Sequence, residues 1–120
     1  MNTFYVKRGD FCWVRFGKGE GHKQGGLRPC IVVQNDIANL HSPTTIVVLV
    51  TSHLKRADLP CHVEFMRRNG TMNIALCEQI TTIDKKFIMN VTEHLSDADM
   101  FNVDRALKAS ISNEGVKKYG

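Results

Sequence analysis

The stretch Gln24-Gly25-Gly26-Leu27-Arg28-Pro29 runs directly into the apolar segment Cys30-Ile31-Val32-Val33. Glycine allows backbone conformations that a Cβ forbids, while Pro29 fixes its own φ and biases Arg28 towards extended geometry. The apolar segment shows no polar alternation, so we expect a strand from Pro29 to Gln34 that is buried on both faces. Arg28 is therefore held at a bend beside a rigid strand.

The chain of 120 residues fits one domain, residues 1–120, with a polar tail at 113–120 that we expect to fray. Hydrophobic residues make up 42% and charged residues 23%, which is typical of a soluble globular protein. No apolar run approaches the roughly 20 residues that span a bilayer, and the N-terminus has no secretory apolar region. We expect a cytoplasmic protein.

Four cysteines, Cys12, Cys30, Cys61 and Cys77, each lie in or beside an apolar segment and include no C-x-x-C pair. This distribution predicts buried reduced thiols. A zinc site that uses Cys61, His62 or His53 stays open as an alternative, but these residues lack the paired spacing of structural zinc sites. We therefore expect no metal and no cofactor.

Positive charge is concentrated at the start of the chain. Residues 1–30 hold six Lys or Arg and two acidic residues, a balance of 6 − 2 = +4, whereas residues 31–120 hold ten of each. The whole net charge lies in the segment that includes Arg28. Such a concentration suits a polyanion such as RNA, and a solvated loop that only aids solubility is the alternative.

Alternating and β-branched segments predict many short strands and a small, mostly antiparallel barrel. A glycine-rich segment, 17–26, predicts a long mobile loop after the first strand. Asn35 and Asp36 can cap a short helical turn, and Arg67-Arg68-Asn69-Gly70 is a turn by composition. The strands are expected at residues 10–16, 29–34, 44–52, 62–66, 74–81 and 90–94.

One substantial helix is expected near the C-terminus. Ser96 can cap it with Asp99 three residues on. An apolar stripe then repeats at helical spacing and predicts packing against the core; its members are Met100, Val103, Leu107 and Ile111. The fold class is therefore mainly β with α additions.

The ordered motifs resemble the MazF/PemK family, the toxins of bacterial toxin-antitoxin systems. The similarity runs from about residue 6 to about residue 111, and the set is far more specific than any one motif. The motifs are Lys7-Arg8-Gly9-Asp10 with Trp13-Val14, Gln24-Gly25-Gly26-Leu27-Arg28-Pro29, Gln34-Asn35-Asp36, Ser42-Pro43-Thr44, Val50-Thr51-Ser52, Leu59-Pro60-Cys61-His62-Val63-Glu64, Glu78-Gln79-Ile80 and Thr82-Ile83-Asp84-Lys85.

This resemblance implies an SH3-like barrel and a homodimeric endoribonuclease that cuts single-stranded RNA without metal. On the family pattern the catalytic arginine is Arg28 and the catalytic hydroxyl residue is Thr51. The resemblance also implies a cognate antitoxin protein with a flexible acidic segment as a partner. The candidate RNA-binding residues are Lys18, Lys23, Gln24, Ser52, Glu78 and Gln79. Glu78 and Gln79 have the alternatives of bracing Arg28 or satisfying buried neighbours.

The chain departs from the family pattern in two places. Members usually carry Ser-Glu before the Gln-Gly-Gly, where this chain has His22-Lys23, and an aspartate where this chain has Arg15. An imidazole titrates near neutral pH, so His22 is a candidate general acid or base, with an ordinary loop residue as its alternative.

Two other functions stay open beside the ribonuclease. One is a non-enzymatic toxin resembling the CcdB gyrase poisons, which binds protein and needs no RNA site. The other is a member of the MazF/PemK family that binds its antitoxin or RNA but no longer cleaves. Arg28, Thr51 and their flanking motifs favour the ribonuclease.

Overall fold

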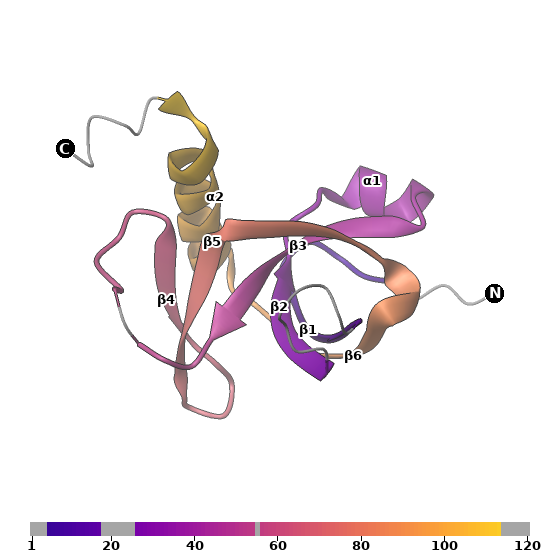
Figure 1. The fold of residues 1–120 in the computed structure, drawn as a ribbon, viewed down its shortest axis with the longest axis horizontal. Coiled ribbons are helices and arrows are strands. Elements are labelled where there is room, and N and C mark those ends of the chain that lie inside the picture. Colours follow the sequence, from indigo (N-terminus) through magenta and orange to yellow (C-terminus); the bar gives the residue numbers. More distant parts are fainter. Residues whose placement is uncertain (1–4, 18–25, 55, 114–120) are drawn as a thin grey trace.

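The computed structural model describes residues 5–17, 26–54 and 56–113. Within these ranges six strands form one antiparallel sheet in the order β4-β5-β3-β2-β1-β6 (Figure 1). The strands are β1 Asp10–Phe16, β2 Gly26–Val32, β3 Thr44–Thr51, β4 His62–Met66, β5 Met72–Asp84 and β6 Ile88–His94. The helices are α1 Asp36–His41, the 3₁₀ turn η1 Lys85–Phe87 and α2 Asp97–Ile111. The expected fold, mainly β with a C-terminal helix, is confirmed.

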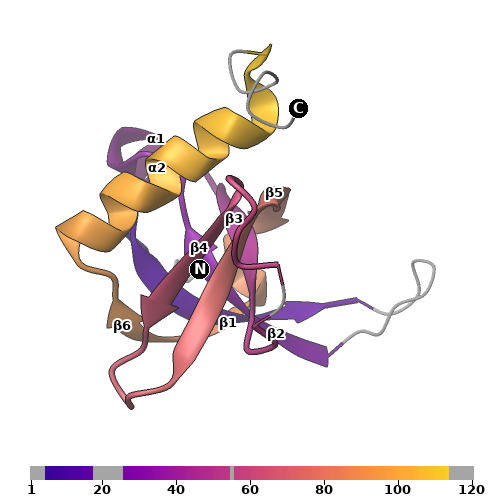
Figure 2. The same cartoon turned by 90° about the vertical axis from the view of Figure 1, so that its left-hand side faces the viewer.

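The sheet is buried on both faces along β1, β2 and β3. Neighbouring side chains of one strand enter different cores, as Ile31 and Val32 do, because successive residues of a strand point to opposite faces. The larger core includes Phe11 and Val103 and lies under α2, which packs against β4 and β5 (Figure 2). The smaller core lies on the other face of these strands and includes Cys12 and Val47.

Strand β2 begins at Gly26, three residues before the predicted start at Pro29. Gly26 has a φ of 91°, a conformation that favours glycine. From Gly26 to Pro29 the strand pairs with β1, and its ladder with β3 starts only at Cys30. Proline has no N–H to donate, so it is tolerated where one edge of a strand is open. The predicted burial on both faces holds only for the second half, Cys30 to Val32.

Strand β5 carries an irregularity that bends the sheet. Val48 on β3 pairs with Ile80, yet the next residue, Leu49, pairs with Leu76. One step along β3 thus corresponds to four along β5, which leaves residues 77–79 without a partner on β3. Bulges increase local twist and re-aim side chains. The long strand β5 therefore curves round the sheet (Figure 1).

An ion pair joins the two edge strands, which share no backbone ladder in the described residues. Arg67, just after β4, donates to Glu93 on β6 through Nε at 2.9 Å and Nη2 at 2.7 Å. The backbone N–H of Arg68 donates to the other carboxylate oxygen at 2.8 Å. The Arg67 guanidinium also lies 4.2 Å from the ring centroid of Phe11. Side chains thus bring together the edges of a sheet that does not close, and Arg67, predicted from composition only as part of a turn, is one of them.

A buried polar network holds α1 to the sheet. The Asn39 side chain accepts from Thr45 Oγ1 at 2.6 Å and from Gln34 Nε2 at 2.9 Å. Its amide donates to the Gln34 carbonyl at 2.9 Å, and the buried Lys85 ammonium donates to the Asn39 carbonyl. These hydrogen bonds satisfy groups that would be costly to bury alone. They give the Gln34-Asn35-Asp36 and Asp84-Lys85 motifs a structural role.

Helix α2 begins as predicted, with Ser96 Oγ accepting from the Asp99 N–H at 3.1 Å. Met100 and Val103 are buried, and Leu107 packs against the core. Ile111 was wrongly assigned to the core, because its side chain is 73% exposed. Ala106 is buried on the core face instead, and Ile111 is the last residue of the helix.

All four cysteines are buried reduced thiols, as predicted. Burial raises the pKa of Cys12 to about 12, with the Asp10 charge adding to it, and burial also raises the pKa of Cys30. These thiols therefore pack as small apolar side chains. Among the described residues, no helix is long and apolar enough to cross a membrane.

We predict that Arg67→Ala lowers the free energy of unfolding by about 3 kcal/mol, because it leaves the Glu93 carboxylate largely buried without its partner. Arg68→Ala is the matched control, since Arg68 contributes its backbone N–H and its side chain is exposed. Urea unfolding followed by circular dichroism measures both. Equal stability of the two variants would contradict a structural role for the ion pair.

The Glu93 carboxylate also predicts how stability depends on pH. Burial opposes its ionisation, but hydrogen bonds from Arg68 and Arg67 outweigh burial and lower its pKa below 4.5. Its stabilisation is therefore complete above pH 4.5 and is lost as the pH falls through the lowered pKa. We expect Glu93→Gln to flatten the acid side of the stability profile, measured by urea unfolding from pH 3 to 7. A wild-type slope retained in the variant would argue against this group.

Candidate active site

Arg28 and Thr51 lie on neighbouring strands at the point where the β2–β3 ladder ends. Cys30 pairs with Leu49, and the same antiparallel register, continued by two residues, sets Arg28 opposite Thr51. Opposed residues of neighbouring strands point to the same face. Both side chains therefore share the face of Cys30 and Leu49, where the smaller core ends.

Pro29 explains why this place is open. It cannot donate to β3, so the ladder stops at Cys30, while β2 continues with β1 alone. The end of β1 and the start of β2 project from the body of the sheet (Figure 2). The result is an open edge between Arg28 and Thr51 where an extended ligand can lie.

The Arg28 side chain is half-buried and makes no ion pair or side-chain hydrogen bond with any residue that the structure describes. Its carbonyl accepts a weak bond from the Cys30 thiol, 3.8 Å away. A guanidinium offers a planar fork of donors that matches two phosphate oxygens. The donors of Arg28 are therefore available to an anion.

The Thr51 hydroxyl has a fixed orientation. Its oxygen accepts the His53 backbone N–H at 3.0 Å, in a local turn that begins as β3 ends. A hydroxyl has one proton to donate besides the lone pairs that accept. With an acceptor site already used, the Thr51 O–H is free to donate to an oxygen lying near Arg28.

Glu78 and Gln79 lie exposed in the irregular part of β5, on the strand next to β3. Glu78 is held by His62, whose Nε2 lies 3.2 Å from one carboxylate oxygen and 3.3 Å from the other. Glu78 therefore does not brace Arg28, one of the alternatives considered from the sequence. It presents a positioned acidic group on the outside of the sheet.

The Glu78 carboxyl is ionised at neutral pH. Burial opposes this, but a backbone hydrogen bond and hydrogen bonds from His62 and Cys61 outweigh burial and lower its pKa. A carboxylate repels phosphate but accepts hydrogen bonds from the amino groups of nucleic acid bases. Glu78 can therefore contact bases of a nucleic acid and not its backbone.

The other predicted site residues divide into two groups. Ser52 is exposed directly after Thr51. Lys18, His22, Lys23 and Gln24 lie outside the described residues, as does most of the expected loop at 17–26. The described chain thus places four predicted residues, Arg28, Thr51, Glu78 and Gln79, on β2, β3 and β5.

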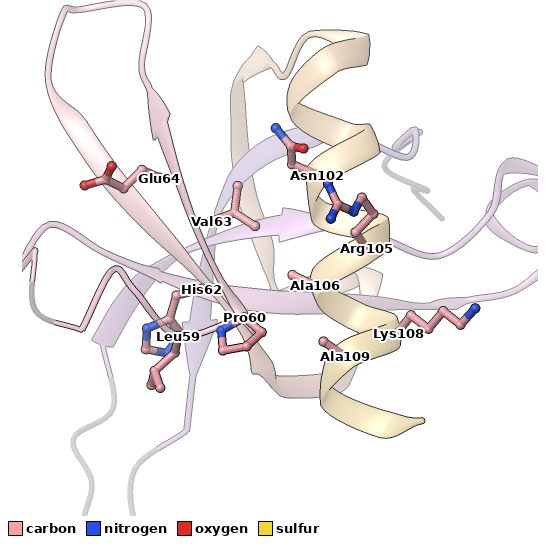
Figure 3. A pocket seen from close by; sticks show the side chains of 10 residues that line it. All are labelled: Leu59, Pro60, His62, Val63, Glu64, Asn102, Arg105, Ala106, Lys108 and Ala109. Atoms are coloured by element: carbon pink, nitrogen blue, oxygen red, sulfur yellow. The ribbon is translucent and has the colours of Figure 1, made fainter. Parts of the chain in front are cut away.

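A groove of about 610 Å³ lies elsewhere, between the segment leading into β4 and helix α2 (Figure 3). Leu59, Val63 and Ala106 give it apolar walls, while Arg105 and Lys108 lie along the helix. Neither Arg28 nor Thr51 lines it. This groove is suited to a partner surface and not to the chemistry of the open edge.

Sequence reasoning left His62 only as an alternative zinc ligand and did not find its contact with Glu78. The two residues are 16 positions apart, and only the pairing of β4 with β5 brings them together. No sequence spacing signals such a contact.

Comparison with known proteins identifies the family of the chain. Residues 7–111 match the family of PemK-like, MazF-like toxins of type II toxin-antitoxin systems. The chain is 44% identical over 110 residues to "Endoribonuclease EndoA" of Bacillus subtilis (strain 168), which covers 89% of this chain and 95% of that protein.

Solved structures share the fold. An endoribonuclease in complex with its cognate antitoxin, from a mycobacterial species, superposes with a TM-score of 0.74 at 19% identity, over 88% of this chain and 94% of that one. The MazE–MazF complex of Deinococcus radiodurans gives a TM-score of 0.74 at 21% identity, over 89% and 96%. With its family match and its close relative, the chain belongs to the PemK-like, MazF-like toxins of type II toxin-antitoxin systems.

Proposed function

We propose that this protein is a sequence-specific endoribonuclease toxin that cleaves single-stranded mRNA without metal and is neutralised by a cognate antitoxin. One feature supports the proposal above the others: the β2–β3 register, continued two residues beyond Cys30 and Leu49, sets Arg28 opposite Thr51 at an open strand edge, and the guanidinium is unpaired among the described residues. Membership of the toxin family supports it. The protein would act as a homodimer in the bacterial cytoplasm.

The reaction is an attack of a ribose 2′-OH on the adjacent phosphorus. The P–O bond to the 5′-oxygen breaks, which leaves a 2′,3′-cyclic phosphate and, after protonation of the leaving oxygen, a 5′-hydroxyl. Negative charge increases on the phosphate oxygens in the transition state, so preorganised donors lower the barrier. Arg28 supplies two such donors, and Thr51 donates to an oxygen or holds the 2′-OH in line. His22 is the candidate for proton transfer.

Base recognition falls to polar residues around this edge. Glu78 and Gln79 are positioned to hydrogen-bond base edges, while Lys18 and Lys23 suit the RNA backbone, with Gln24 and Ser52 as further contacts. The ionised Glu78 favours bases that present amino donors, as cytosine and adenine do. This gives specificity to a site whose phosphate chemistry is the same at every nucleotide.

The antitoxin partner fits the groove between β4 and α2. Its apolar walls suit an amphipathic or extended segment, and Arg105 and Lys108 suit acidic side chains on that segment. Relatives of the fold have been solved with a cognate antitoxin. The alternative of a gyrase-binding toxin offers no role for the paired positions of Arg28 and Thr51.

The function is tested by incubating the protein with a long RNA of mixed sequence in EDTA and mapping the new 5′ ends. We expect cuts at one short motif, and Arg28→Ala should lower the rate by about 10³-fold, since it removes the donors that stabilise the transition state. Arg28→Lys keeps the charge without the fork and should recover only part of the rate. Intact RNA with the folded wild-type protein would overturn the proposal.

The hydroxyl of Thr51 is tested separately. Thr51→Val keeps the shape of the side chain and removes its donor, so we expect the cleavage rate to fall by about 10²-fold. Thr51→Ser retains the hydroxyl and should keep most of the rate. Single-turnover cleavage of a short RNA containing the mapped motif gives both rates, and equal rates for the valine and serine variants would exclude a role for the hydroxyl.

A further inference from the structure

Three side chains with metal-binding atoms converge where β4 meets the irregular part of β5. The thiol of Cys61, the imidazole of His62 and the carboxylate of Glu78 place their ligand atoms within 4.8 Å of one another. In residues 5–17, 26–54 and 56–113 this is the only such group of three. The pairing explains it, because Cys77 N–H donates to the Cys61 carbonyl at 2.9 Å, which sets Cys61 and His62 beside Glu78.

The orientation of His62 directs one nitrogen at this cluster. Its Nδ1 lies 2.8 Å from the Arg56 carbonyl, and a carbonyl only accepts, so Nδ1 carries a proton. Nε2 then faces the Glu78 carboxylate, which also only accepts when ionised. A cation is needed between these two atoms, either a proton on Nε2 or a metal ion.

The hydrogen bond from His62 Nδ1 to a backbone carbonyl is of the kind that metal-bound histidines make. Such a histidine usually donates its other N–H to a backbone carbonyl or a carboxylate, which fixes the ring and its tautomer. Here the carbonyl belongs to Arg56, a non-glycine residue with φ of 57°, in a turn where the same oxygen accepts the Leu59 N–H at 3.2 Å. An uncommon backbone conformation is thus used to aim a carbonyl at His62.

The distances suit a small tetrahedral ion. Zinc ligands bound at the usual lengths lie about 3.4 Å apart for nitrogen and oxygen and about 3.6 Å for nitrogen and sulfur. His62 Nε2 and Glu78 are already 3.2 Å apart. Cys61 also hydrogen-bonds to the Glu78 carboxylate, so its sulfur already points to the shared centre.

We propose that Cys61, His62 and Glu78 form a binding site for a divalent transition-metal ion, Zn²⁺ in particular, with a fourth position open to solvent. A thiolate, an imidazole and a carboxylate are ligands that zinc accepts together. On binding, the Cys61 thiol releases its proton to water and its sulfur becomes a thiolate ligand. Glu78 is 40% exposed, so the ion can enter from its side of the site.

The ion would regulate the protein and take no part in cleavage. Resting on the proposed function, in which Glu78 contacts RNA bases, we infer that bound zinc holds this carboxylate and slows cleavage. The proposed ligands lie at the start of β4 and on β5, whereas Arg28 and Thr51 lie on β2 and β3.

Binding is measured directly by titrating the full-length protein with Zn²⁺ in a calorimeter and with Co²⁺ in a spectrophotometer. We expect one ion per chain and a thiolate-to-cobalt charge-transfer band. Cys61→Ser and His62→Gln should each weaken binding by at least about 10-fold and Cys61→Ser should abolish the band, because each removes a ligand. Cys12→Ala and His41→Gln are controls for the other thiols and for surface imidazoles, and should bind as the wild type does.

If circular dichroism shows that the Cys61 variant does not fold, Glu78→Gln provides the test instead, because it removes a ligand at an exposed position. Absence of binding by the wild type, or equal affinity in the wild type and the three ligand variants, would overturn the site. The rate of RNA cleavage in zinc divided by the rate in EDTA should be well below one for the wild type and near one for Cys61→Ser. Cleavage in EDTA without zinc binding would overturn this inference alone, whereas zinc binding without cleavage would overturn the proposed function.

Discussion

The pairing of β3 with β5 is the constraint on which the rest of the structure depends. The two strands change register between Val48 and Leu49, and residues 77–79 of β5 have no partner on β3. The bend lets a single sheet enclose a small core on one face while the other face receives α2. It also turns Cys77 into the larger core and leaves Glu78 and Gln79 exposed. One irregularity thus serves both packing and the candidate site.

Two local features then shape the open end of this sheet, where the candidate site lies. Pro29 ends the β2–β3 ladder at Cys30, so Arg28 has no backbone pairing with β3, the strand that ends at Thr51. The end of β3 folds into a turn that uses the Thr51 oxygen as an acceptor. The strands hold both residues rigidly, and rigid placement is what a site needs to stabilise charge in a transition state. The stability of the sheet and the geometry of the site therefore have a common origin.

A largely buried ion pair connects the two edges of the sheet. Arg67 and Glu93 link β4 to β6 through side chains, with Phe11 under the guanidinium. The pair is largely buried, so it contributes more to stability than an exposed pair would and is sensitive to acid. By contrast, Arg28 has no such partner in the described chain. Arg67 is therefore a structural cation, whereas Arg28 is available to a ligand.

The sequence by itself determined the strands, the capped helix at Ser96 and the choice of Arg28 and Thr51, because apolar periodicity, capping residues and short motifs are local signals. Ile111 misled because periodicity gives the face of a helix but not which residues at its end remain buried. Only the tertiary structure decided that His62 supports Glu78, that Cys61 joins them and that Arg67 binds Glu93. These contacts join residues that lie 16 to 26 positions apart in the sequence. They depend on strand register, because a one-residue shift would turn each side chain to the other face of the sheet. No local pattern encodes that register, so the convergence of Glu78 with Cys61 and His62 and the linked edges became visible only in three dimensions.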